Sequence, residues 1–122
     1  MSNITTKIED GIIINTIVGK ISAYEIFKFI ESNLDEWKEM PILYNISDAQ
    51  FEDFSSSNMD KFIDSIKPLF KKRGIGKTAL VSYKNSNFGV LRMFEIMVEK
   101  NMLNNRYASF RNIDEAKKWL QN

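Results

Sequence analysis

The side chains with the greatest capacity for chemistry lie between positions 48 and 64. They are five carboxylates and three consecutive serines: Asp48, Glu52, Asp53, Asp60, Asp64, Ser55, Ser56 and Ser57. Carboxylate oxygens at such spacing suit a hard cation such as Mg²⁺. Acidic side chains are equally at home in a solvated loop and at the start of a helix, where they interact favourably with the helix dipole. We favour the second interpretation and predict no metal and no cofactor.

Two residue types are missing, and their absence excludes most familiar enzyme chemistry. The 122 residues include no His and no Cys. A thiol nucleophile, a zinc ribbon and a Ser-His-Asp triad are therefore impossible. The string Gly74-Ile75-Gly76-Lys77-Thr78 is similar to the end of a phosphate-binding loop. That loop also needs a glycine where Lys71 stands, and a helix after the Lys-Thr pair where a strand is predicted. We predict that the protein is not an enzyme.

The charges are balanced overall but unevenly distributed along the chain. Seventeen basic residues face sixteen acidic ones, for a net charge of +1. Residues 25–64 hold ten acids and three bases, whereas residues 65–122 hold four acids and twelve bases. Such polarity suggests a surface for a protein partner or for self-association. No aromatic platform is interleaved with the basic residues, so we predict no nucleic-acid partner.

The chain reads as one domain spanning residues 1–122. No linker or repeat divides it, and its length suffices for a hydrophobic core. The first ten residues lack the features of a signal peptide, and no apolar run approaches the length of a membrane span. We predict a cytoplasmic protein without a membrane span.

The elements that must position these side chains begin with a hairpin and a capped helix. Asp10-Gly11 separates two β-prone runs, residues 4–9 and 12–18, which predicts a tight antiparallel turn. Ser22 with Glu25 forms a capping box, and apolar residues follow at spacings of three and four as far as Trp37.

The remainder of the chain alternates strands with helices. Strands are predicted at residues 42–46, 78–83 and 107–110. Helices are predicted from about Ser57 to Gly74 with Pro68 inside, from Asn85–Asn87 onward, and after Asn112. The order ββαβαβαβα favours right-handed crossovers. It predicts an α/β fold with a mixed, mostly parallel five-stranded sheet, four helices, and the first strand antiparallel at one side.

This element order, together with three stretches of sequence, resembles the STAS domain family. The stretches are 43–56 (LYNISDAQFEDFSS), 88–95 (FGVLRMFE) and 110–120 (FRNIDEAKKWL). The family comprises the tails of sulfate transporters and antagonists of anti-sigma factors, and small uncharacterised bacterial proteins are similar to it. In its phosphorylated members, the second serine of an Asp-Ser-Ser-Gly motif accepts phosphate from a protein kinase. By position, Asp53 matches the aspartate and Ser55 the phosphoacceptor, whereas Phe54 and Ser56 depart from the motif.

The resemblance implies a regulatory protein–protein interaction module resembling anti-sigma-factor antagonists. Its partner would be another protein, such as a regulatory kinase or an anti-sigma-type factor, or a second copy in a homodimer. The loop expected to contact that partner comprises Asp48, Glu52, Asp53, Ser55, Ser56 and Ser57. The alternative hypothesis is a small-molecule or lipid-binding domain with a pocket between sheet and helices. That pocket would be lined by Phe62, Phe70, Phe88, Met93 and Met97.

Overall fold

The computed structural model describes residues 3–52, 56–73, 76–100 and 106–122, and it confirms the predicted element order. The strands are β1 (Asn3–Glu9), β2 (Ile12–Ile21), β3 (Ile42–Phe51), β4 (Lys77–Val81) and β5 (Arg106–Phe110). The helices are α1 (Ala23–Trp37), α2 (Ser56–Arg73), α3 (Asn85–Lys100) and α4 (Ile113–Gln121). Pro68 lies inside α2, as predicted.

The five strands form one sheet in the order β1-β2-β3-β4-β5. β1 is antiparallel to β2, and the other three pairs are parallel, as predicted. The turn between β1 and β2 has positive φ at both central residues, 54° at Asp10 and 76° at Gly11. Two left-handed residues in succession give a two-residue turn whose twist matches that of the flanking strands.

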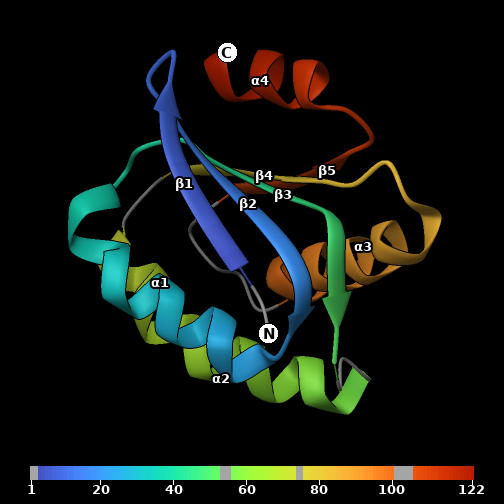
Figure 1. The fold of residues 1–122 in the computed structure, drawn as a ribbon. Helices are drawn as coiled ribbons and strands as arrows, with labels where there is room; N and C mark the ends of the chain where they lie inside the picture. Colours follow the sequence, from blue (N-terminus) through green and yellow to red (C-terminus); the bar gives the residue numbers. More distant parts are fainter. Residues whose placement is uncertain (1–2, 53–55, 74–75, 101–105) are drawn as a thin grey trace.

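The strand order also decides which face each helix covers. Each crossover from β2 to β5 moves one strand further in the same direction, so right-handed connections place α1, α2 and α3 on one face. Figure 1 shows these three helices on one side of the sheet and α4 on the other. The largest cluster on the three-helix side joins Leu34 of α1 to Met59, Ile63 and Ile66 of α2.

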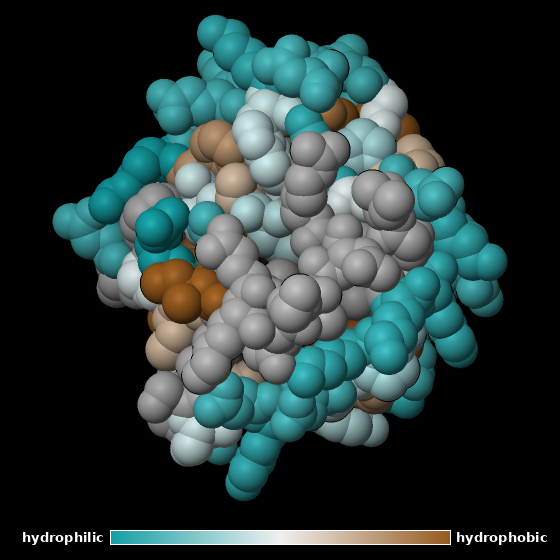
Figure 2. All heavy atoms as spheres, turned by 180° about the vertical axis from the view of Figure 1, so that it is seen from behind, coloured by the Kyte–Doolittle hydropathy of each residue, from teal (hydrophilic) through white to brown (hydrophobic). Residues whose placement is uncertain are grey.

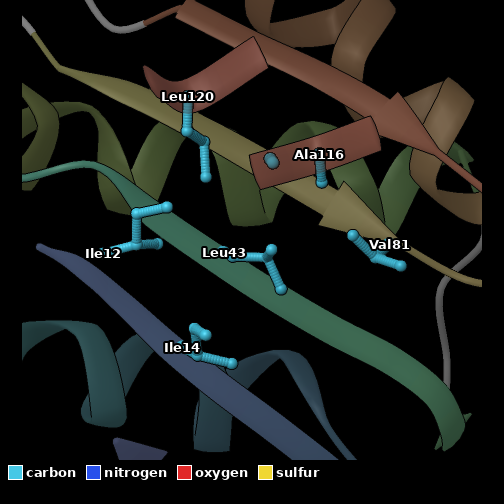
Figure 3. Packing of buried hydrophobic residues seen from close by; sticks show 7 residues of the cluster. Ile12, Ile14, Leu43, Val81, Ala116 and Leu120 are labelled. Atoms are coloured by element: carbon cyan, nitrogen blue, oxygen red, sulfur yellow. The ribbon is translucent and has the colours of Figure 1, made fainter. Parts of the chain in front are cut away.

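Helix α4 covers the opposite face of the sheet with apolar side chains. Ala116 and Leu120 pack against Ile12, Leu43 and Val81 of the sheet, as Figure 3 shows. Asn112 caps this helix, because its side-chain oxygen accepts a hydrogen bond of 2.8 Å from the Glu115 amide.

Lys77, from the glycine-rich string, contacts the end of α4. Its ammonium donates hydrogen bonds to the Trp119 and Asn122 carbonyls at 2.9 and 3.0 Å. The cation therefore stabilises the carboxyl end of α4, where exposed carbonyls carry partial negative charge. The predicted strand begins within the string, at Lys77, and continues to Val81.

β3 is longer than predicted, and this changes the setting of Asp48. The strand was expected to end at Ile46, with Asp48 in the following loop, but it continues to Phe51. Ala49 and Phe51 pack with Ile17 and Ile21, which keeps the second half of the strand against the core. Asp48 is therefore a strand residue that faces solvent.

Candidate functional site

The predicted site residues that the structure describes, Asp48, Glu52, Ser56 and Ser57, lie where the carboxyl ends of β2, β3 and β4 meet the first turns of α1, α2 and α3. In α/β sheets, this edge is the usual location of binding sites, because connections converge there and leave polar groups exposed. In Figure 1 the starts of α1 and α2 lie close to the ends of β2 and β3. Ser22 begins this region with the predicted capping box, since its hydroxyl accepts from the Glu25 amide at 3.2 Å while Glu25 accepts from the Ser22 amide at 3.1 Å.

The second half of β3 pairs with β2 on one edge and is held on its other edge by side chains in place of a strand. Pairing between β3 and β4 stops at Asn45 and Val81, so the β3 backbone beyond Asn45 needs other partners. The buried Asn87 amide donates to the carbonyls of Ile46 and Ala49 at 2.9 and 2.8 Å. The first residues of α3 are therefore attached to the end of β3.

The β4–α3 connection also holds Asp48 in an exposed polar cluster. The Lys84 ammonium and the Tyr83 hydroxyl both donate to Asp48 Oδ1, at 3.1 and 3.2 Å. These two hydrogen bonds, that from Lys84 first, hold the pKa of Asp48 below its ordinary value. The Tyr83 amide donates to the Ser47 hydroxyl at 3.3 Å, which fixes the connection against β3. This arrangement stabilises the ionised form of the Asp48 carboxyl group.

A groove opens between the first turns of α1 and α2. Its volume is about 470 Å³, and its walls come from Ser22, Ala23, Tyr24, Phe27, Glu52, Asn58, Lys61, Phe62 and Ser65. Tyr24 is 68% exposed although it is large and aromatic. Aromatic side chains such as tyrosine are enriched in protein interfaces relative to the rest of the surface.

The structure assigns the six predicted loop residues to different places. Asp48 belongs to the cluster with Tyr83 and Lys84, whereas Glu52 lines the groove. Ser56 is the first residue of α2, and Ser57 is exposed in its first turn. Asp53 and Ser55 lie outside the described residues, as does the side chain of Ser56.

Three contributors to this region were missed in the sequence. Tyr24 was visible as an aromatic residue outside the apolar stripe of the first predicted helix, which is the signal for an exposed ring. Asn87 was interpreted as one of several caps, and Lys61 carried no distinguishing pattern. Asn87 acts on β3, and Lys61 lines the groove together with residues of α1. In both cases the partner element is distant in the sequence.

The alternative hypothesis predicted a pocket between the sheet and the helices. The structure has a cavity there, but most of its lining residues differ from those predicted. A cavity of about 90 Å³ lies between the sheet and α1–α3, and Phe62 lines it as expected. Met93 was expected there as well but is not among the lining residues; it packs against the cluster of α1 and α2. The side chains of Phe70, Phe88 and Met97 lie outside the described residues.

Two further searches concern metals and membranes. Within residues 3–52, 56–73, 76–100 and 106–122, no three carboxylates come together as metal ligands. None of the described helices is long and apolar enough to cross a membrane. Figure 2, which views the molecule from behind, shows a mainly hydrophilic surface with small hydrophobic areas.

Comparisons with known proteins identify the fold. No family model and no curated protein match the sequence. An anti-sigma factor antagonist from Mycobacterium paratuberculosis is similar in structure, with a TM-score of 0.68 and 11% identity over 100% of this chain and 96% of that one. An uncharacterised DUF3478 protein with a SpoIIAA-like fold from Shewanella loihica is also similar. Its TM-score is 0.58 and its sequence identity is 16%, over 98% of this chain and 93% of that one. The anti-sigma factor antagonist SpoIIAA in its unphosphorylated form has a TM-score of 0.53 and 13% sequence identity, over 98% of this chain and 99% of that one. The chain therefore has the STAS-like, SpoIIAA-like fold that the sequence predicted.

Proposed function

We propose that this chain is a non-catalytic regulatory module of the cytoplasm that binds another protein through the groove between α1 and α2. The observation that carries the proposal is the 68% exposed Tyr24 at the wall of this groove. Burying an aromatic ring of this size is a large favourable contribution, and tyrosine is enriched among residues that dominate protein interfaces. The likeness to solved anti-sigma factor antagonists supports a protein as the occupant.

The charged residues beside Tyr24 indicate which charged groups a complementary partner surface would carry. Glu52 and Lys61 line the same groove, so a complementary surface would present a basic and an acidic group around an apolar recess for the tyrosine ring. Opposite charges at the rim of an interface orient the encounter and reject wrong partners more than they add affinity. We expect a transient complex, since the groove combines a single exposed aromatic anchor with polar walls.

Phosphorylation of Ser55 would regulate this binding. The proposal rests on the match of Ser55 to the phosphoacceptor position of the STAS motif and on its place in the sequence, directly before the first residue of α2. A phosphate at a helix N-terminus is stabilised by the backbone amides and the helix dipole. It would also add negative charge three residues after Glu52 in the sequence, and we expect repulsion of the partner's acidic group to weaken binding.

Site-specific photo-crosslinking tests the docking surface. A benzophenone amino acid is placed at Asn58 in the groove, and at the exposed Lys118 of α4 as the control. We expect one discrete adduct from position 58 in extract of the source organism, none from position 118, and loss of the adduct when Tyr24→Ala is added. The purified protein is irradiated alone to detect a second copy as the occupant. Equal labelling at both positions, or an adduct that survives Tyr24→Ala, would contradict the proposal.

Ser55 is tested with the same assay. Ser55→Asp should reduce the adduct from position 58, whereas Ser57→Asp, two residues further on, should change it less. Unchanged labelling in Ser55→Asp would remove Ser55 from the account while leaving the docking surface intact.

A further inference from the structure

A second feature of the fold is the interior cavity on the three-helix side of the sheet. Its volume is about 90 Å³, and seventeen side chains from four strands and three helices line it. Protein interiors are close-packed, and voids larger than a water molecule are few in a domain of this size. A cavity walled by three different helices is therefore a specific property of this chain.

The walls define what the cavity can hold. Most are aliphatic or aromatic, such as Ile17, Ile46, Leu80 and Phe94, and none of the described lining residues carries a charge. Water needs several polar partners to occupy an interior site, and an apolar cavity of about 150 Å³ in another protein stays dry and accepts benzene or xenon. Tyr44, Thr78 and Tyr107 bring hydroxyl-bearing side chains to the wall.

The cavity is separated from the groove by one helix and shares a residue with it. Phe62 of α2 contributes to the walls of both, while its neighbours Met59 and Lys61 belong to the cavity and the groove respectively. Phe62 is itself buried, and its ring lies 5.9 Å from that of Phe94 across the interior. A molecule in the cavity would therefore contact the helix whose outer side forms the groove.

We propose that this cavity is a binding site for one small, uncharged, predominantly apolar molecule of about the size of benzene. Binding requires no charged partner, and the free energy comes from the removal of apolar surface from water and from new van der Waals contacts with the walls. The inference rests on the cavity and its lining, and it stands whether or not the groove binds a protein.

Benzene and xenon are suitable probes, followed by NMR of the side-chain methyl groups. The probe should shift the methyl resonances of Ile17, Ile46 and Leu80 saturably, with one bound molecule per chain. Val90→Phe places a ring where a lining side chain stands now and should weaken benzene binding at least tenfold. Val18→Phe is the matched control, because Val18 is 46% exposed on β2 and is not a lining residue, so benzene binding should change less than twofold.

Folding of the variants is checked by thermal unfolding, and Leu80→Phe serves as a second filling variant if Val90→Phe fails to fold. Benzene should also raise the melting temperature of the wild type more than that of the filled variant, since a ligand stabilises only the state that binds it. The absence of saturable shifts at the three lining residues would overturn the proposal, and so would equal binding by the wild type and a folded filled variant.

Discussion

The Asn87 side chain donates hydrogen bonds to β3 that a neighbouring strand would otherwise make. Its amide donates to two carbonyls of β3 at 2.8 and 2.9 Å, in the region that β4 does not reach. Buried backbone carbonyls are costly to leave without a donor, and this requirement explains an asparagine in the first turn of α3. The residue is 9% exposed, so water cannot fully replace it.

The first prediction concerns the removal of that donor. Asn87→Ala should lower the free energy of unfolding by about 1–3 kcal/mol, because the Ile46 and Ala49 carbonyls lose their partner. Urea unfolding monitored by tryptophan fluorescence measures the change. Asn33→Ala is the control, since the Asn33 amide donates to the Phe29 carbonyl within one helix, and its loss should cost less. Equal effects of the two substitutions would contradict the role assigned to Asn87.

Asp48 allows a prediction about pH. Hydrogen bonds from Lys84 and Tyr83 hold its pKa below the ordinary value. The stabilisation from this depressed pKa is therefore present above the pKa of the unfolded chain, and it is lost as the pH falls through the folded-state value. NMR titration of the carboxyl carbon in Lys84→Met should give a midpoint nearer the ordinary aspartate value than in the wild type. An unchanged midpoint would show that Lys84 does not hold the carboxylate.

At the scale of elements, short sequence patterns predicted the features that depend on residues close together in the chain. The Asp10-Gly11 turn, the Ser22–Glu25 capping box and the Asn112 cap are interactions between residues at most three positions apart. The mostly parallel pairing follows from the alternation of strands and helices, which requires crossover connections.

The length of β3 could not be predicted in the same way. Its polar residues Ser47 and Asp48 end the apolar run after Ile46, which locally indicates a turn. The strand continues because it stays paired with β2 as far as Ile21 and Phe51. Asn87 and the β4–α3 connection bind its other edge, from about forty residues further along the chain. The register also shifts between Thr16 and Val18 of β2, a feature that no short sequence window contains.

Two glycines give a matched prediction for the turn and for α3. Gly11→Ala should destabilise the protein by roughly 1–2 kcal/mol, because φ is +76° there and a side chain disfavours left-handed backbone. Gly89→Ala should stabilise it by up to about 1 kcal/mol, because alanine favours a helix interior. A Cβ at either position meets nothing within 4 Å, so backbone conformation alone separates them. Thermal and urea unfolding measure both, and the same sign for the two changes would contradict this explanation.

At the scale of the whole molecule, the fold could be predicted from the sequence, whereas the proposed docking surface could be predicted only in outline. The element order and three stretches of sequence resembled the STAS family, and the structure has that fold. Of the predicted loop residues, Asp48 and Glu52 lie in different parts of the edge formed by the carboxyl ends of the strands. The groove depends on how α1 packs beside α2, which brings Tyr24 near Asn58 and Lys61 from distant positions in the chain.

The most direct test of the central claim is the affinity of the crosslinked partner for surface variants, measured by isothermal titration calorimetry. Tyr24→Ala should weaken binding by about 30-fold, the effect of truncating an aromatic residue that dominates an interface. Ile8→Ala is the matched control, because Ile8 is also large and 66% exposed but lies on β1, away from the groove. Its affinity should stay within twofold of the wild type. Wild-type affinity in a folded Tyr24→Ala variant would contradict the assignment of this groove as the docking surface.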